Sequence, residues 1–314
     1  MGHQRILITG GGGFVGSCLA RELIASGHEV HMLLRRESSR WRLEGLDGLY
    51  LPHEADLRDA AGVRRAVDAC RPEVIYHLAA HGALHHQQNR AAIVASNLSG
   101  TCNLLEALDH HDYQRLVHVG SSSEYGHKPR PMREDDRLEP RTDYAVSKAA
   151  AALMVQAAGY QGRPVAIVRI FSAYGPWEDP SRLVPYVMRC CLRGERPRVS
   201  AGRQPRDFIH VDDCVELLKL AAELPEAQGQ VLHAGGGRRQ TVREMVESML
   251  EVCTSGYLQA DFGAESQRPD EPNVWLADIE HTTLLTGWRP RCGLVEGIER
   301  TWSWYQATYA ALAA

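Results

Sequence analysis

The sequence lacks three features that would place it in large classes of proteins. No apolar stretch approaches the ~20 residues that a membrane-spanning helix needs, and the eight cysteines never form a Cys-x-x-Cys pair. The 35 lysines and arginines do not outnumber the 39 aspartates and glutamates, and the net charge of −4 leaves no basic excess for nucleic acid. We therefore expect neither a membrane protein nor a nucleic-acid-binding protein.

The start of the chain also lacks the layout of a signal peptide, because a short predicted strand begins at Arg5. We therefore expect a cytoplasmic protein whose cysteines are reduced thiols. Histidines cluster in three short stretches, but adjacent histidines on one strand or helix point apart, whereas zinc needs three or four convergent ligands. No metal site is expected. The hydrophobic content of 44% and charged content of 24% are those of an ordinary globular protein.

A glycine-rich turn is present near the amino terminus, between a predicted strand and a predicted helix. Residues 5–9 are apolar and partly β-branched, Gly10, Gly13 and Gly16 follow, and a helical pattern then runs to Gly27. Glycines allow close backbone approach to a pyrophosphate, and the amino terminus of the helix offers it free N–H groups. This arrangement predicts a dinucleotide site, although the spacing differs from the commonest Gly-x-Gly-x-x-Gly.

Two arginines follow the second predicted strand and bear on the choice of cofactor. Sites for NAD carry an Asp or Glu roughly 20 residues past the glycines, which accepts from the ribose 2′-hydroxyl. Arg35 and Arg36 occupy this place, 19 and 20 residues after Gly16. Two guanidinium groups suit a 2′-phosphate by charge and by geometry. We therefore favour NADP(H) over NAD(H), although the neighbouring Glu37 leaves NAD(H) open.

Tyr144 and Lys148 lie four residues apart in a helical pattern and therefore share one face of the helix. The lysine ammonium can stabilise a tyrosine phenolate, whose ordinary pKa is about 10. A hydroxyl from another segment can steady the substrate oxygen whose proton the tyrosine takes. Ser122, 22 residues before Tyr144, is the hydroxyl we expect. The trio predicts proton transfer at a carbinol or carbonyl beside a hydride carrier.

Short apolar strands also appear near residues 74–78, 116–120 and 165–170, and helical stretches separate them. Strands of this kind suit a parallel sheet buried on both faces. The expected fold is thus α/β, a doubly wound parallel sheet of the Rossmann type with a smaller carboxyl-terminal substrate lobe.

The expected domain boundaries follow from a change in pattern after Ile170, where prolines divide the chain into short pieces. We expect residues 1–175 to form the dinucleotide-binding domain, with 206–236 returning to it. Residues 176–205 and 237–314 would form the lobe that binds the substrate.

Motifs along nearly the whole chain resemble those of extended short-chain dehydrogenases/reductases, in particular the nucleotide-sugar epimerase/dehydratase family. In order and at the family's spacing, they occupy residues 9–16, 56–59, 77–80, 97–101, 121–126, 174–176 and 206–213. The resemblance implies that Asp56 holds the adenine amine and that Asn97 braces the active site. The other cofactor contacts that it implies, together with Arg35 and Arg36, come from Gly10, Gly13, Phe14, Val15, Leu57, Leu78, Ala79, Ala80, Tyr144 and Lys148.

The resemblance further implies that a nucleotide-diphosphate sugar is the partner, with Arg206 and Arg268 on its phosphates. Ser123 and Ser172 would contact the substrate, although the family's usual Asn before Tyr-Gly-Pro is replaced in residues 171–174. The serine stretch is one residue shorter than in the family. Counting from the strand selects Ser122 as the catalytic hydroxyl, and counting back from the following Tyr-Gly selects the residue before it.

The reaction implied is proton and hydride transfer at C4 of the sugar, by an epimerase or a 4-keto-sugar reductase. A 4,6-dehydratase that uses Glu124 is the alternative, and a non-enzymatic NADP(H) sensor is a more distant one. Members of the family commonly dimerise through the helix that carries Tyr144, so we also expect a homodimer.

Overall fold

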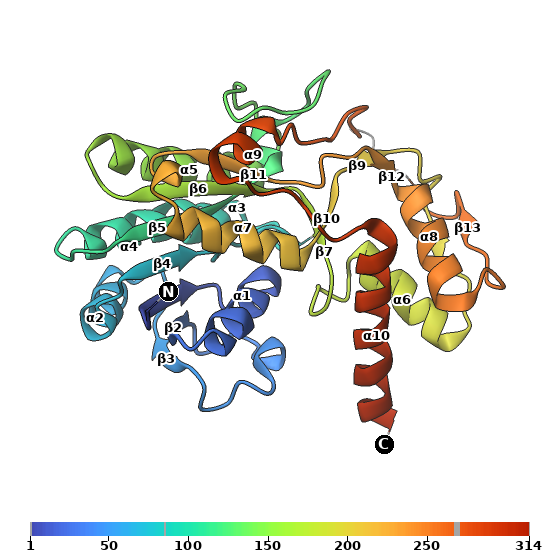
Figure 1. The fold of residues 1–314 in the computed structure, drawn as a ribbon, viewed down its shortest axis with the longest axis horizontal. Coiled ribbons are helices and arrows are strands. Elements are labelled where there is room, and N and C mark those ends of the chain that lie inside the picture. The colour runs from blue at the N-terminus through green and yellow to red at the C-terminus, as the bar shows by residue number, and fades with distance from the viewer. Residues whose placement is uncertain (1, 85, 267–270, 314) are drawn as a thin grey trace.

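A central sheet of seven parallel strands organises the larger part of the molecule, shown in Figure 1. The computed structural model describes residues 2–84, 86–266 and 271–313. The strand order is β11-β6-β5-β4-β1-β2-β3, and each neighbouring pair is parallel. The strands are β1 (Arg5–Thr9), β2 (Glu29–Leu34), β3 (Leu51–Glu54), β4 (Val74–His77), β5 (Arg115–Ser121), β6 (Val165–Ile170) and β11 (Val231–Ala234).

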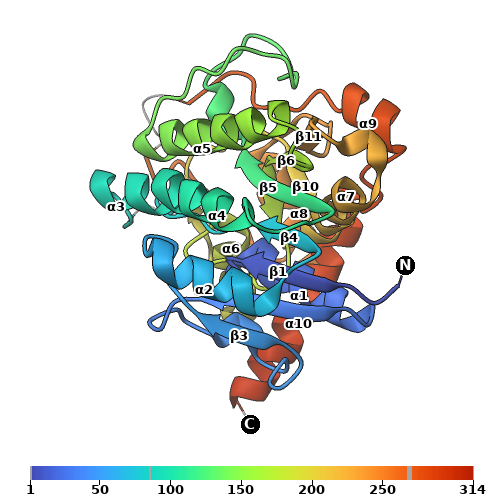
Figure 2. The ribbon, with the colours of Figure 1, turned by 90° about the vertical axis from the view of Figure 1, so that its left-hand side faces the viewer.

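Helices cover both faces of this sheet, which confirms the doubly wound architecture (Figure 2). Along β1, the side chains of Ile6 and Ile8 enter one hydrophobic core, and that of Leu7 enters the other, because successive residues of a strand face opposite sides. One face carries α1 (Phe14–Ala25) and α7 (Val211–Glu223), and the other carries α2 (Ala60–Cys70), α4 (Gly100–Leu108) and α5 (Asp143–Tyr160).

The strand order reverses between β1 and β4, so the segments that follow these two strands diverge at the carboxyl edge of the sheet. Ligands of doubly wound sheets bind at such a switch point. The segment after β4 leads into α3 (Arg90–Val94), a single π-helical turn, η2 (Ala95–Ser99), and α4. Two short 3₁₀ turns, η1 (Trp41–Leu43) and η3 (Ser122–Tyr125), follow β2 and β5.

A separate hydrophobic core holds the smaller lobe, on the right of Figure 1. Met245 and Met249 of one helix, Val187 and Met188 of a second and Ile298 of a third are fully buried in it. These helices are α8 (Val242–Thr254), α6 (Leu183–Arg193) and α10 (Leu294–Ala313). Three short strand pairs complete the lobe and its junction: β7 (Ser172–Tyr174) with β10 (Phe208–His210), β9 (Pro205–Arg206) with β12 (Gln240–Thr241), and β8 (Arg198–Val199) with β13 (Asp261–Phe262).

The lobe differs from the expected boundaries in one segment. Helix α9 (Glu280–Thr286) packs on β11 and on the 3₁₀ turn η4 (Pro225–Ala227) at the edge of the main sheet. The ring of Trp288 is 2% exposed in the core formed by the sheet, α1 and α7. Part of the segment 237–314 thus returns to the sheet because its apolar side chains cover the outermost strand.

Within the part of the chain that the structure describes, no helix combines the length and apolar character needed to cross a bilayer.

Candidate active site

The glycine turn connects β1, α1 and the segment after β4 so closely that side chains would collide. Gly10 has φ +77°, and a Cβ there would lie 2.6 Å from the backbone nitrogen of Ala79. A Cβ on Gly16 would overlap the carbonyl oxygen of Gly10. Helix α1 begins at Phe14, and no side chain caps it. The first-turn N–H groups of Phe14 and Val15 are therefore suited to a pyrophosphate.

Charged side chains gather at the ends of β2 and β3, where an adenosine ribose would lie. Arg35 and Arg36 are exposed directly after β2. After β3, the carboxylate of Asp56 accepts from Arg58 at 2.9 Å (Nε) and 2.6 Å (Nη2). These hydrogen bonds, and more weakly the charge of Arg35, hold the pKa of Asp56 below its usual value. Asp56 is therefore anionic, with lone pairs left for an adenine amine.

The remaining expected cofactor residues occupy two different environments. Leu57 is 5% exposed, and its side chain packs in the core beside Gly100. Leu78 and Ala79 are half-buried, and Ala80 is exposed, so these three line the carboxyl edge of the sheet. Hydrogen bonds from the Leu78 N–H to the Thr9 carbonyl (3.0 Å) and from the Ala79 N–H to the Thr9 hydroxyl (3.4 Å) fix their backbone.

The serine whose side chain acts on Tyr144 is Ser121, the last residue of β5. The Ser121 side chain lowers the pKa of Tyr144, and its hydroxyl bonds that of Ser123 at 2.8 Å. Ser122, expected at this place, is 5% exposed. The strand extends through Ser121, and a 3₁₀ turn begins at Ser122 and carries its side chain inward. The shorter serine stretch thus matches the count back from Tyr125-Gly126.

Lys148 lies one helical turn beyond Tyr144 and over the same strand. Its Nζ donates to the carbonyl oxygen of Val119 at 2.6 Å, and the side chain is 3% exposed. Burial lowers the pKa of Lys148 to about 8, against the opposing effect of the Glu124 carboxylate. Burial raises the pKa of Tyr144, and the Ser121 side chain acts in the other direction. Tyr144 is thus half-buried and Lys148 buried, side by side on α5.

Asn97 braces this site from the π-helical turn η2. Its Oδ1 accepts from the backbone N–H of His81 at 2.7 Å, and its Nδ2 donates to the His81 carbonyl and to the Ser147 hydroxyl, both at 2.8 Å. Ser147 lies between Tyr144 and Lys148 on α5. The asparagine side chain therefore joins the segment after β4 to the catalytic helix. Single π-turns within helices often occur at functional sites.

Glu124, expected as the base of a dehydratase, is fully buried. One carboxylate oxygen accepts from the backbone N–H of Ser121 at 2.7 Å, which closes a capping box, and the other accepts from Nε of Arg169 at 2.8 Å. Both oxygens are thus held within the protein, away from solvent. In this arrangement Glu124 positions Ser121 and does not face a substrate.

A chain of buried hydrogen bonds continues from Arg169 in β6. Its guanidinium donates to the Tyr125 hydroxyl, which lies 2.6 Å from Nε2 of His233. Nδ1 of His233 lies 2.9 Å from the Asp278 carbonyl, so this nitrogen carries the proton and Nε2 accepts from the tyrosine. Burial lowers the pKa of His233 to about 3, so the ring is neutral. Sequence reasoning missed this network, although an arginine within the apolar residues 165–170 was a signal of a buried partner.

The expected substrate residues lie on the junction with the lobe. Arg206 in β9 donates from Nη2 to Glu271 at 2.7 Å, and from Nη1 to the Pro205 carbonyl at 2.8 Å. Ser172 opens β7, and its N–H donates to the Asp207 carbonyl at 3.0 Å. Arg268 lies outside the described residues. A phosphate at Arg206 would thus compete with the carboxylate of Glu271.

One further residue connects to Tyr144 electrostatically. The charge of Arg182, the residue before α6, lowers the pKa of Tyr144 and that of the half-buried Glu178. Burial nevertheless raises the pKa of Glu178 to about 8, so its carboxyl is protonated at neutral pH. Sequence reasoning had singled out neither residue.

Comparison with known proteins identifies the family. The sequence model of the NAD dependent epimerase/dehydratase family matches residues 6–235, well over half of the chain. The chain belongs to this family. It is 30% identical to a dTDP-glucose 4,6-dehydratase of Streptomyces niveus over 326 aligned residues, which cover 96% of this chain and 93% of that protein.

Solved structures agree with this assignment. A UDP-glucose 4-epimerase of Thermotoga maritima, solved with UDP-glucose, is similar with a TM-score of 0.88 and 25% identity, over 97% of this chain and 99% of that one. MoeE5, solved in complex with UDP-glucose and NAD, has a TM-score of 0.85 and 30% identity, over 98% and 100% of the two chains. This member of the epimerase/dehydratase family is therefore an NAD(P)-dependent enzyme with the extended short-chain dehydrogenase/reductase fold.

Proposed function

We propose that this enzyme performs reversible redox chemistry at C4 of a nucleotide-diphosphate sugar, as an epimerase or a 4-keto-sugar reductase. The observation that carries the proposal is the placement of Ser121, Tyr144 and Lys148 together at the carboxyl end of β5, where Lys148 donates to the carbonyl of Val119 and the Ser121 side chain lowers the pKa of Tyr144. In the oxidising direction Tyr144 accepts the C4 hydroxyl proton, Ser121 orients that oxygen, and hydride leaves C4 for the nicotinamide. Lys148 supplies the positive charge that favours the phenolate.

Sugar recognition in this proposal comes from the junction with the lobe. Arg206 would bind the diphosphate, with Arg268 as the second arginine, since forked guanidinium donors suit phosphate oxygens. Ser123 and Ser172 would contact the sugar. The half-buried, ion-paired state of Arg206 supports the proposal, because a diphosphate can replace the carboxylate of Glu271.

The second candidate is a 4,6-dehydratase, which the 30% identity to such an enzyme favours. It would require Glu124 to take the C5 proton. That carboxylate is fully buried between Ser121 and Arg169, and this supports the redox-only reading over elimination. Freeing it would leave the buried Arg169 without its partner.

NADP(H) is the cofactor that we propose. The side chains of Arg35 and Arg36 are exposed after β2, close enough to Asp56 for Arg35 to lower the pKa of its carboxyl. A 2′-phosphate placed there would meet two cations. The proposal sets this protein apart from the relative solved with NAD.

A homodimer is proposed on α5. Val146, Leu153 and Met154 share one face of this helix and are 51%, 52% and 42% exposed. Val94 on the adjacent α3 is 40% exposed. Such a grouping of large apolar side chains is typical of a buried interface with a second copy.

A panel of nucleotide-diphosphate sugars and their 4-keto derivatives, incubated with and without NADPH, tests the reaction. Mass spectrometry distinguishes the outcomes: a new stereoisomer of unchanged mass for an epimerase, two added hydrogens for a reductase, and loss of water for a dehydratase. An unchanged panel, with cofactor bound, would contradict the proposal. Loss of water that disappears in Glu124→Gln would establish the dehydratase instead.

A further inference from the structure

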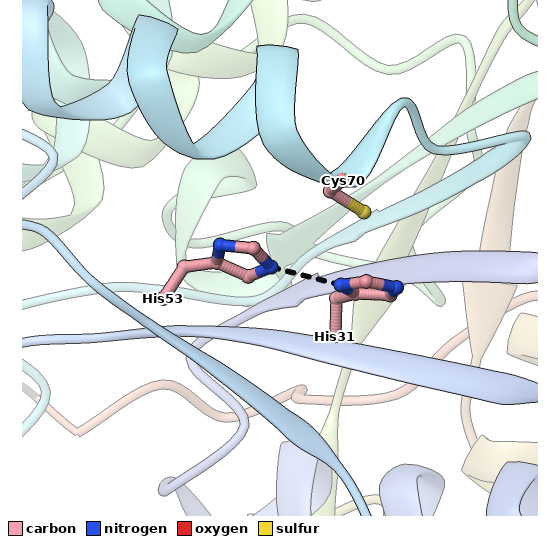
Figure 3. A group of neighbouring side chains, drawn as sticks. All are labelled: His31, His53 and Cys70. Atoms are coloured by element: carbon pink, nitrogen blue, oxygen red, sulfur yellow. Dashed lines mark hydrogen bonds between the residues drawn. The ribbon is translucent and has the colours of Figure 1, made fainter.

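Two histidines and a cysteine converge at a place unrelated to the active site, between β2, β3 and α2 (Figure 3). His31 comes from β2, His53 from β3, and Cys70 is the last residue of α2. One nitrogen of each ring and the sulfur all lie within 4.8 Å of one another. His31 is 5% exposed, Cys70 is 2% exposed and His53 is half-buried.

The hydrogen bonds at His31 fix which of its nitrogens is free. Its Nε2 lies 2.7 Å from the carboxylate of Glu29, and a carboxylate accepts, so this nitrogen carries the proton. Nδ1 therefore presents a lone pair, and it lies 2.8 Å from Nε2 of His53. In the metal-free protein His53 donates to it. The two rings are stacked, with centroids 5.1 Å apart.

We propose that Nδ1 of His31, Nε2 of His53 and Sγ of Cys70 bind one zinc ion, with water as the fourth ligand. Imidazole nitrogen and thiolate sulfur are the ligands that zinc prefers, at about 2.0–2.1 Å and 2.3 Å. In tetrahedral geometry two such nitrogens lie roughly 3.3 Å apart, so the rings need to separate by about half an ångström. The half-buried His53 leaves a route for the ion and the water.

The Glu29 carboxylate strengthens the assignment. Histidines that bind zinc commonly donate their other N–H to a carboxylate, which fixes the ring and raises its basicity. His31 already has this arrangement in the metal-free state. On binding, His53 moves its proton to Nδ1, Cys70 releases its thiol proton, and three bonds to the ion form.

The ligands belong to three segments that no local motif connects, which is why neighbouring histidines in the sequence gave no sign of them. The site lies on the face of β2 and β3 that α2 covers. His31 is near the start of β2, whereas Arg35 follows its end, and α2 runs back so that Cys70 closely precedes the start of β4. The ion would tie the outer strands β2 and β3 to α2, and it takes no part in the proposed reaction.

Titration of the tag-free full chain with Zn²⁺ by calorimetry, and with Co²⁺ by absorption spectroscopy, tests the site. We expect one equivalent of either ion, a thiolate-to-cobalt charge-transfer band, and a higher melting temperature with Zn²⁺. Cys70→Ser should abolish the band, and His53→Ala should weaken Zn²⁺ binding more than tenfold. Glu29→Gln should weaken it about tenfold by releasing the outer nitrogen of His31.

Cys102→Ser is the matched control, because Cys102 is a half-buried thiol of α4 outside the cluster. It should retain the band and the affinity. His53→Ala removes a half-buried ring and should fold even if Cys70→Ser, at a buried position, does not. Circular dichroism verifies the folding of both variants. Absence of stoichiometric binding to the wild type, or equal affinities for wild type and His53→Ala, would overturn the proposal. Zinc binding is measured independently of turnover, so failure of this proposal is distinguishable from failure of the proposed function.

Discussion

Ser121 and Ser122 are adjacent, yet β5 and the turn after it give their hydroxyls different surroundings. Ser121 ends the strand, its hydroxyl bonds that of Ser123, and its side chain lowers the pKa of Tyr144. Its backbone N–H is held by the buried Glu124. Ser122 begins the turn and faces inward. At the scale of single residues, a shift of one position thus decides which hydroxyl can touch a substrate.

The first prediction concerns Tyr144 and the two serines. Tyr144→Phe removes only the oxygen that transfers the proton, so turnover should fall roughly 10²–10⁴-fold while cofactor still binds. Ser121→Ala should lower kcat clearly more than Ser122→Ala, because the Ser121 side chain acts on Tyr144 whereas that of Ser122 is buried. Steady-state kinetics on the substrate identified by the panel measure both effects. A larger loss in Ser122→Ala would restore the count from the strand side.

Lys148 gives a prediction about pH. Its pKa of about 8 means that the ammonium is present below pH 8 and is lost as the pH rises through that value. If the charge is needed, kcat/KM should fall by about tenfold per pH unit on the alkaline side. The dissociation constant for NADPH should rise over the same interval. In Lys148→Met the binding constant should no longer vary there, and an unchanged pH dependence in this variant would rule out Lys148 as the titrating group.

Arg35 and Arg36 give a prediction about cofactor choice. Each charge-assisted contact with a 2′-phosphate contributes about 1.5–3 kcal/mol. Replacing both arginines with alanine should therefore weaken the binding of NADP(H) by at least 100-fold. The binding of NAD(H), which lacks the 2′-phosphate, should remain nearly unchanged. Fluorescence titration with both reduced cofactors measures this. Equal losses for the two would show that the arginines do not hold the phosphate.

At the scale of elements, β5 and β6 are joined by more than their backbone hydrogen bonds. Arg169 on β6 reaches Glu124 in the turn after β5, and the side chains of both residues are at most 5% exposed. The guanidinium also lies over the ring of Tyr125, 4.5 Å from its centroid. The turn that presents Ser121 is therefore held from the neighbouring strand, through a buried ion pair.

Breaking that pair from one side should be costly. Arg169→Met leaves the Glu124 carboxylate buried without its cation, and the free energy of unfolding should fall by about 3–5 kcal/mol. The double variant Glu124→Gln with Arg169→Met removes both charges and should recover part of the loss. Urea denaturation of the single and double variants measures this. A double variant as unstable as the sum of the single ones would show that the two side chains are not coupled.

The sequence alone predicted the elements whose signals are local. The strand, glycine turn and helix at residues 5–27 and the spacing of Tyr144 and Lys148 correspond to what the structure shows, because both depend on neighbours in the chain. The partners of Arg169 could not be predicted in this way. Glu124, Tyr125 and His233 come from separate segments, and only the packed sheet brings them together.

The whole molecule shows the same distinction at its domain boundary. The prolines after Ile170 predicted a change of architecture, but they gave no sign that α9 and Trp288 lie on the main sheet. Helix α9 is short, with seven residues. Thr282 on it donates to Glu134 at 2.9 Å and accepts from the N–H of His233 at 2.7 Å. These contacts link distant segments, so the periodicity within residues 280–286 could not predict them.

The last prediction concerns assembly of the whole molecule. Leu153 lies midway along α5 and is 52% exposed, with Val146 and Met154 on the same face. In a dimer built on this face, Leu153→Glu would bury a carboxylate against its own symmetry mate, and the two charges would repel. Light scattering after size exclusion should give a dimeric mass for the wild type and a monomeric mass for Leu153→Glu. Tyr257→Glu, at a 73% exposed aromatic site in the lobe, is the matched control and should remain dimeric. A monomeric wild type would contradict the proposed dimer. A dimeric Leu153→Glu would show that the interface lies elsewhere.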